Sequence, residues 1–205
     1  YESYAELPGC LSGSDLYLDN LTMDNFQDLY IVNALMEAMH DSDQPITSME
    51  FQCGDGNYGQ TFGNRIDPSS VDFALRICLA QGARWINYYT FSGGHNYRLD
   101  PAPDDGNGRI AHTGERHGFA APISPEGTLN YTYPRLASVT LAMRAVGHKL
   151  ASMREERDRI ALGFIPDYYM TEYHPPNDVA VLGVVADLEA NRGRGAWELM
   201  CRAML

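Results

Sequence analysis

The stretch that decides the fold consists of two strand-like segments, PITSMEF at Pro45–Phe51 and RWINYYTF at Arg84–Phe91, joined by NRIDPSSVDFALRICLAQGA. Both segments are rich in β-branched or aromatic residues and have Pro or Gly residues nearby, which is typical of strands. In the joining segment, Asp67 is a candidate N-cap, Pro68 suits the first helical position, and Gly82 suits the residue past the end. The pattern therefore predicts a strand, a helix and a second strand.

The residues before this unit repeat the same order. DLYLDN at Asp15–Asn20 predicts a short strand, and apolar residues at helical spacing predict a helix over residues 24–40. Three strands separated by two helices predict a parallel sheet with helical crossovers, so the fold class is α/β. A segment rich in Gly, Pro, Asp and His follows from Ser92 to about Gly127, and segments of this length are usually functional. Residues 130–153 predict another helix.

A charged stretch, REERDR at Arg154–Arg159, separates this region from the rest of the chain. We expect a first domain over residues 1–154, and over residues 155–205 a linker and the beginning of a second α/β domain. RIALGFI predicts a buried strand there, and ELMCRAML predicts a helix that ends without a cap. The natural chain is therefore expected to continue past Leu205.

The composition argues against several classes of partner. The 205 residues are 44% hydrophobic and 20% charged, which is typical of a soluble globular protein. The net charge of −12 argues against nucleic acid and anionic membrane surfaces, and no apolar run is long enough to span a membrane. Four scattered cysteines without C-x-x-C spacing are expected to be reduced and mostly buried. The compartment stays open, with a cytoplasmic location favoured over secretion.

The working residues of parallel α/β folds lie at the carboxyl ends of the strands. This rule selects Asp19 and Asn20, the stretch Glu50–Asp55, and the stretch Phe91–Tyr97. Glu50 is the sharpest candidate, because a carboxylate in a buried strand is costly unless it is paired or functional. The alternative is that Glu50 points to a polar side of the strand or pairs with an Arg.

The third strand and the turn after it carry a mixture of polar and aromatic side chains. Alternation puts Asn87, Tyr89 and Phe91 on one face. A double Gly follows, and then His95, Asn96 and Tyr97. Such a mixture suits a sugar, whose hydroxyls need hydrogen bonds and whose C–H face packs on aromatic rings. The alternative is an aromatic strand that only packs in a barrel core.

Metal and cofactor signals are weak. The histidines are scattered and lack the paired helical spacing of zinc hydrolases, and the Asp104–Asn107 stretch lacks the ligand pattern of a calcium loop. No Gly-rich phosphate fingerprint follows a strand, and the G-x-S-x-G elbow of acyl hydrolases is missing. We therefore expect no metal and no cofactor.

PITSMEFQCG, followed after a helix by GARWINYYTFSGGHNY, resembles the end of the catalytic barrel in β-galactosidases of glycoside hydrolase families thirty-five and forty-two. GFAAPISPEG at Gly118–Gly127 is similar to the family segment that precedes the last barrel helix. The resemblance covers roughly residues 15–153, and it implies the last three or so β/α units of a (β/α)8 barrel. The tail from Arg159 resembles the start of the glutamine amidotransferase-like second domain of family forty-two.

The resemblance implies a retaining exo-β-glycosidase, most simply a β-galactosidase, with Glu50 as the nucleophile. The implied substrate-binding residues are Asn20, Gln52, Asn87, Tyr89, Phe91, His95, Asn96 and Tyr97. His95 stands where Thr is common in the family, and Gln52 with Cys53 replaces the pattern that follows the nucleophile in family thirty-five, which puts the identity of the sugar in doubt. The full-length protein would be a homo-oligomer, a trimer or a dimer.

In the family the acid/base Glu follows an Asn at the end of strand four. This sequence has no Asn-Glu dipeptide, so we expect the acid/base to lie outside it and the chain alone to be inactive. Two alternatives stay open. One is a non-catalytic carbohydrate-binding or structural protein with a degenerate barrel, and the other is a different barrel or flavodoxin-like enzyme unrelated to sugars.

Overall fold

The computed structural model describes residues 7–41, 43–54, 65–95, 116–118, 120–163, 179–190 and 196–205. In these ranges the protein is a mixed α/β structure with five strands and five helices. The strands are β1 (Ser14–Leu16), β2 (Ile46–Gln52), β3 (Ala83–Tyr89), β4 (Gly94–His95) and β5 (Arg116–His117). The helices are α2 (Phe26–Met39), α3 (Pro68–Ala80), α5 (Tyr133–Leu150), α6 (Val179–Glu189) and α7 (Ala196–Met204). The chain divides into two compact units, Tyr1–Glu155 and Glu156–Leu205.

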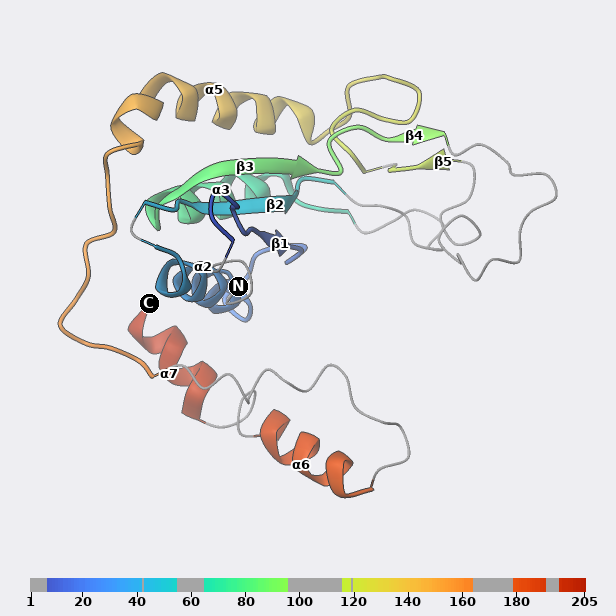
Figure 1. Cartoon of the computed structure of the whole chain (residues 1–205). Helices are drawn as coiled ribbons and strands as arrows, with labels where there is room; N and C mark the ends of the chain where they lie inside the picture. Colours follow the sequence, from blue (N-terminus) through green and yellow to red (C-terminus); the bar gives the residue numbers. More distant parts are fainter. Residues whose placement is uncertain are drawn as a thin grey trace. The chain divides into compact units, whose positions relative to one another are not determined.

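In the first unit, β1, β2 and β3 form a parallel sheet in chain order, with β2 in the middle (Figure 1). Helix α2 connects β1 to β2, and α3 connects β2 to β3, so the predicted parallel sheet with helical crossovers is confirmed. Asp15 is the register partner of Glu50, and Gln52 is the partner of Tyr89. The carboxyl ends of the three strands therefore meet at one edge of the sheet.

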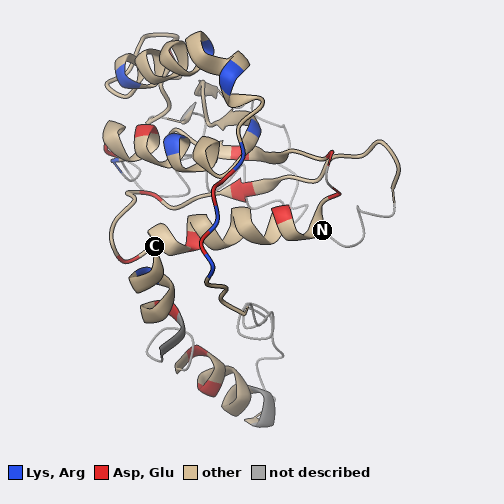
Figure 2. Ribbon diagram, turned by 90° about the vertical axis from the view of Figure 1, so that its left-hand side faces the viewer, with Lys and Arg blue, Asp and Glu red and all other residues tan. Residues whose placement is uncertain are grey.

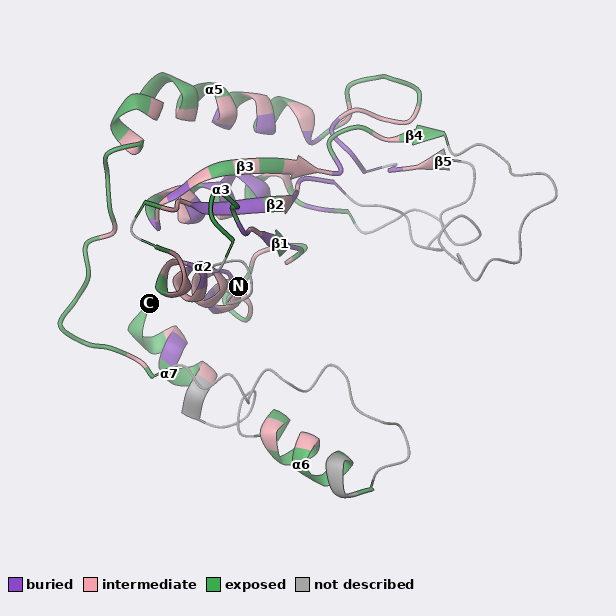
Figure 3. Ribbon diagram, in the orientation of Figure 1, coloured by how far each residue is buried: buried purple, intermediate pink, exposed green. Residues whose placement is uncertain are grey.

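The hydrophobic core covers one face of this sheet. Leu16 of β1 and Phe51 of β2 are buried in one cluster with side chains of α2, α3 and α5, among them Leu29, Leu75 and Leu136. Figure 3 shows β2 largely buried, whereas much of the outward surface of α5 is exposed. Each fully buried side chain of this size contributes about 1.5–3 kcal/mol, so the cluster is the main source of stability of this unit.

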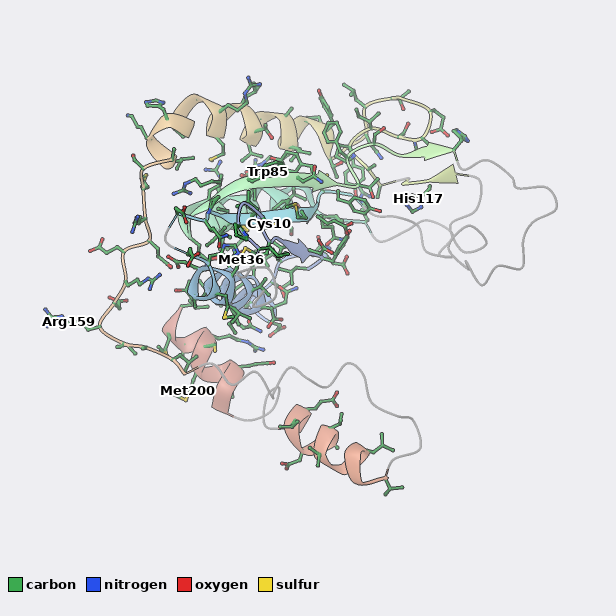
Figure 4. All side chains as sticks on the ribbon, viewed as in Figure 1. Cys10, Met36, Trp85, His117, Arg159 and Met200 are labelled. Carbon is green, nitrogen blue, oxygen red and sulfur yellow. The ribbon has the colours of Figure 1, made fainter. Side chains whose placement is uncertain are left out.

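The opposite face of the sheet carries exposed side chains, and we call it the open face. Trp85 of β3, labelled in Figure 4, is 54% exposed, and Tyr17, which follows β1, is 45% exposed. Asn87 of β3 is exposed as well. The three helices described in the first unit thus contribute to the core on one face, and the other face carries polar and aromatic side chains.

Local signals set the helix boundaries close to the predicted ones. Asp67 caps α3, because its carboxylate accepts a hydrogen bond from the Ser69 backbone N–H at 2.8 Å, and Pro68 is the first helical residue. Gly82 follows the helix with a φ of 107°, a conformation that favours glycine. Helix α2 begins later than expected, with Asn25 in place of Asp24 as its N-cap.

A buried carboxylate joins α3 to α5. Asp72 is 4% exposed and accepts hydrogen bonds from Arg76 on its own helix at 2.7 Å and from Arg135 on α5 at 2.6 Å. Burial alone would raise the pKa of Asp72, but the bonds from the two guanidinium groups outweigh that effect and lower the pKa below its ordinary value. The last helix of the first unit is therefore fixed by charge as well as by apolar contact.

Beyond β3 the chain runs beside the segment that precedes α5. Ser92 forms a parallel bridge with Ile123, and Gly93 N–H donates to the Ile123 carbonyl at 2.8 Å. β4 and β5 pair antiparallel, with Gly94 opposite His117. The two ends of the long segment predicted from Ser92 to Gly127 are thereby held together.

In the second unit, α7 confirms the helix predicted at the end of the sequence, whereas α6 was not predicted. The buried strand predicted for RIALGFI is wrong for its described part, since residues 160–163 form no strand and Ile160 is 71% exposed. Figure 2 shows the charges of both signs along the segment that follows α5, which carries REERDR. The amidotransferase-like identity of the second region stays a prediction.

Candidate functional site

An extra residue in β2 decides where Glu50 points. Between Ser48 and Phe51, β2 advances three residues while β3 advances two, from Ile86 to Tyr88. The register with β1 shifts at the same place, between Ser14/Ser48 and Asp15/Glu50. Two neighbouring residues of β2, Met49 and Glu50, therefore lie where a regular strand has one, which is a β-bulge.

The bulge changes the alternation of side chains along β2. Phe51 stays on the core face, with its ring edge-on to Tyr88 at a centroid distance of 6.0 Å. Glu50, as the partner of the exposed Asp15, lies on the open face, and Met49 is 36% exposed there. Asn87 on β3 completes the bulge, because its Nδ2 donates to the Met49 carbonyl at 2.8 Å. Bulges often re-aim a side chain beside an active site.

Glu50 is half-buried at the carboxyl-end half of β2 and is held by an aromatic neighbour. The Tyr17 hydroxyl donates a hydrogen bond to Glu50 Oε2. The Tyr17 ring stands edge-on to Tyr89 of β3, with centroids 6.0 Å apart and an interplanar angle of 81°. The Glu50 carboxylate is thus bonded to one member of an aromatic pair that spans the open face of the sheet.

A second carboxyl group lies on the next strand. Partial desolvation, followed by the negative charge of Glu50, raises the pKa of Asp15 above its ordinary value. The effect of Glu50 on the pKa of Asp15 agrees with the strand register, because the two residues are partners and partners on neighbouring strands point to the same face. Asp15 and Glu50 therefore interact electrostatically on the open face.

Gln52, the next open-face residue of β2 after Glu50, forms a two-way bond with Asp19. Its Oε1 accepts from the Asp19 backbone N–H at 2.8 Å, and its Nε2 donates to Asp19 Oδ1 at 2.9 Å. Both residues come from the carboxyl ends of their strands. The sequence selected this edge, but only the structure joins these two side chains.

Asn20, predicted to bind substrate, uses its side-chain amide within the protein. Its Oδ1 accepts from the Asp67 backbone N–H at 2.7 Å, and its Nδ2 donates to the Arg65 carbonyl at 3.4 Å. These bonds tie the turn after β1 to the start of α3. A role in substrate binding stays a prediction, and the bonds identify a structural role.

The predicted aromatic wall is described in part. Tyr89 lies on the open face and Asn87 beside it, whereas Phe91, 39% exposed, follows the strand. The peptide bond between Tyr89 and Thr90 is cis. His95 is exposed in β4. Asn96 and Tyr97 lie outside the described residues.

A small, mostly apolar pocket lies at the same edge of the sheet, where the ends of the strands meet the core. Leu16, Leu29 and Phe51 contribute to its lining, and Asp19 and Gln52 are its polar members at the strand ends. Glu50 does not line it. Because Glu50 lies on the open face and does not line this pocket, we take the open face as the candidate site.

In the part of the chain that the structure describes, no three His, Cys, Asp or Glu side chains come together as a metal site. None of the helices described is both long and apolar enough to cross a bilayer. The four cysteines form no disulfide; Cys53, Cys78 and Cys201 are buried, as predicted, whereas Cys10 is exposed. Burial raises the pKa of Cys53 to about 12, so its thiol is protonated and unreactive at neutral pH.

Comparisons with protein-family models and with curated proteins give no match to this chain.

Sequence reasoning missed two members of the site, Tyr17 and Asp15. A signal was present, because DLYLD at Asp15–Asp19 alternates acidic or aromatic residues with leucines, and this period of two puts Asp15, Tyr17 and Asp19 on one face. The leucines face the core, as the burial of Leu16 confirms.

Proposed function

We propose that this chain is the nucleophile-bearing part of a retaining exo-β-glycosidase of the β-galactosidase type, in which Glu50 attacks the sugar. The observation that carries the proposal is the Glu50 carboxylate on the open face of the sheet, bonded to Tyr17, whose ring in turn stands edge-on to Tyr89. A carboxylate beside aromatic side chains suits a sugar, because the ring C–H groups pack on aromatic faces while the hydroxyls form hydrogen bonds.

The winding of the sheet supports a barrel. The strands follow one another in chain order, and α2, α3 and α5 all contribute to the core on one face. A doubly wound sheet instead reverses its strand order and carries helices on both faces. In a (β/α)8 barrel, every helix lies outside and the other face of the sheet points inward, with the site at the carboxyl ends of the strands. In such a barrel, Glu50 would point inward at that end.

The chemistry assigned to Glu50 is a double displacement. One carboxylate oxygen forms an ester bond to the anomeric carbon while the glycosidic C–O bond breaks, and a second carboxyl group donates its proton to the leaving oxygen. That second group then takes a proton from water, the water oxygen attacks the anomeric carbon, and the ester bond breaks to restore the carboxylate of Glu50. The family resemblance implies that the second carboxyl group comes from an earlier barrel strand, which precedes the residues that resemble the family.

Tyr17 would act by positioning the nucleophile. Its hydroxyl engages Oε2 of Glu50. In the described part of the chain Oε1 has no hydrogen-bond partner, and it is therefore the oxygen assigned to the attack. A hydrogen bond to a charged group contributes about 1.5–3 kcal/mol, so removal of the Tyr17 hydroxyl should slow formation of the glycosyl-enzyme without abolishing it.

The test is to treat the full-length protein that contains this segment with a fluorosugar inactivator of retaining β-galactosidases, followed by intact-mass analysis and peptide mapping. We expect one sugar adduct on Glu50. Glu50→Gln should give no adduct, because the amide is not a nucleophile. Asp43→Asn, at the exposed opposite end of β2, is the matched control and should label like the parent protein.

A label on another carboxylate, or labelling that persists in Glu50→Gln, would show that the nucleophile is wrongly assigned. Sugar binding at equilibrium without any adduct would favour the alternative of a carbohydrate-binding protein in which Glu50 only accepts a hydroxyl hydrogen bond. Absence of both binding and labelling with a range of glycosides would favour a function unrelated to sugars.

A further inference from the structure

Asp19 has an unusual backbone conformation. Its φ is 52°, and among the described residues it is the one non-glycine residue with positive φ. The left-handed region disfavours residues with a Cβ, although Asp and Asn tolerate it better than most. Such conformations persist where the surroundings hold them, and they concentrate at ligand sites. The interactions of Asp19 are therefore informative.

Gln52 and Asn25 hold Asp19 from both sides. Gln52 bonds its backbone N–H and its Oδ1, as described above. Asn25 Nδ2 donates to the carbonyls of the two flanking residues, Leu18 at 3.0 Å and Asn20 at 3.2 Å. The backbone and one carboxylate oxygen are thus fixed, whereas Oδ2 forms no hydrogen bond within the described ranges of the chain and the side chain is exposed.

We propose that Asp19 is a specificity-determining residue that binds a sugar hydroxyl, with Gln52 as the residue that positions it. The proposal rests on the function proposed above. Asp19 Oδ2 accepts a hydrogen bond from one sugar hydroxyl, and the second N–H of the Gln52 amide, which is not used in the bond to Asp19, donates to the neighbouring sugar oxygen. A fixed acceptor beside a fixed donor recognises a pair of adjacent hydroxyls.

The spacing from the nucleophile supports this assignment. Glu50 and Gln52 are two residues apart on β2, so their Cα atoms are about 6.6 Å apart. They lie on the same face of the strand, and Tyr89, the register partner of Gln52, is beside them. A pyranose ring attacked by Glu50 spans this interval, so one of its hydroxyls away from the reacting carbon reaches the Asp19–Gln52 pair.

Two substitutions change the chemistry of Asp19 while respecting its backbone. Asp19→Asn keeps an oxygen for Gln52 Nε2 and tolerates positive φ, but it replaces the ligand-facing oxygen by an amide donor. Asp19→Gly adopts the same φ without strain and removes the carboxylate entirely. Far-UV circular dichroism and the urea midpoint establish that each variant is folded.

The experiment measures kcat/KM of the full-length enzyme on an aryl β-galactoside and on analogues that each lack one ring hydroxyl. In the parent enzyme, loss of the hydroxyl bound by Asp19 should lower kcat/KM about 10- to 150-fold, the range expected for a hydrogen bond to a charged group. Asp19→Asn and Asp19→Gly should lower kcat/KM by a similar factor on the complete substrate. With the matching analogue, neither variant should show a further loss.

This non-additivity identifies the partner of Asp19, because a merely structural residue would lower the rate on every analogue by the same factor. Asp43→Asn is the control and should reproduce the parent preferences. If every analogue shows independent, multiplicative losses in both variants, Asp19 does not bind a hydroxyl and the inference is wrong. Failure to label Glu50 with any sugar would instead refute the proposed function, so the two failures are distinguishable.

Discussion

Truncation of two neighbouring residues of β2 tests the bulge directly. In a regular strand Met49 and Phe51 share a face, because side chains alternate with a period of two. With the extra residue between Ser48 and Phe51, they lie on opposite faces, Met49 at 36% exposure and Phe51 at 1%. Phe51→Ala and Met49→Ala should therefore have very different effects on stability.

The expected magnitudes follow from the two environments. Phe51 lies in the core cluster and its ring meets Tyr88, so Phe51→Ala leaves a cavity and should cost about 3–5 kcal/mol. Met49 loses part of its apolar contact but leaves no enclosed cavity, so Met49→Ala should cost about 1 kcal/mol. The Met49 side chain packs closely on the backbone of Gly13, where an added Cβ would lie 2.5 Å from Met49 Cγ, and Met49→Ala removes this contact.

Urea unfolding of the 205-residue chain, followed by the fluorescence of Trp85 with Trp197 replaced by Phe, reports the free energy of unfolding of the first unit. Phe51→Leu, with a smaller expected loss, serves if Phe51→Ala does not fold. If both alanine variants lose stability equally, the side chains share a face, the bulge is wrong, and the placement of Glu50 on the open face is lost with it.

Three further predictions concern stability and thiol chemistry. Asp72→Asn should cost about 1–3 kcal/mol, because it weakens the bonds from two arginines that are themselves more than half exposed. Since folding lowers the pKa of Asp72, its contribution to stability is complete above the ordinary carboxyl pKa of about 4 and is lost as the pH falls through the folded value. Urea midpoints measured from pH 5 downward should therefore fall less steeply in the variant than in the parent protein. Gly54→Ala should cost about 1–3 kcal/mol, because the added Cβ would lie 2.6 Å from both Ala121 Cα and the Thr90 carbonyl oxygen. Gly147→Ala in α5, where an added Cβ meets nothing within 4 Å, should instead stabilise the protein by about 0.5–1 kcal/mol. Equal thermal midpoints for the two variants would contradict the packing described. Ellman's reagent should modify Cys10 rapidly in the native protein but Cys53 and Cys78 only after unfolding, since burial raises their pKa values to about 12 and about 11; rapid reaction of two or more thiols in a Cys10→Ser variant would show that this burial is wrong.

The elements predicted well are those that local chemistry determines. The cap at Asp67, the Pro after it and the Gly at position 82 each act through neighbouring backbone groups. Accordingly, α3 begins at Pro68, directly after the cap, and ends just before Gly82. The short strands were recognised by β-branched and aromatic content, and their boundaries shifted by a few residues because strand ends depend on pairing with other strands.

Glu50 was selected as the key residue from sequence, but its face was not predictable from alternation along its own strand. In the bulge, Met49 has no register partner in β1 or β3. Its carbonyl accepts a hydrogen bond from the side chain of Asn87, which is 38 positions away in the sequence. Asn20 has a structural role that the sequence did not predict, since its side-chain amide bonds the backbone of Arg65 and Asp67. Both outcomes depend on contacts between segments distant in sequence.

The second unit shows a limit of hydrophobic content as a signal. RIALGFI was predicted to be a buried strand, yet Ile160 is largely exposed, because an apolar stretch is buried only where a complementary surface covers it. The apolar segment VAVLGVVADLE forms α6, although its polar residues show no clear helical period. Hydrophobic content therefore predicted neither the exposure of residues 160–163 nor the helix at Val179–Glu189.

The bulge makes Met49 a residue that the alternation of side chains along β2 does not require. Removal of Met49 would bring Ser48, Glu50 and Phe51 opposite Ile86, Asn87 and Tyr88 in regular register, so Glu50 would stay on the open face and Phe51 on the core face. In homologous sequences we therefore expect position 49 to vary in residue type and to be absent in some, while the residues at positions 50 and 51 keep their faces.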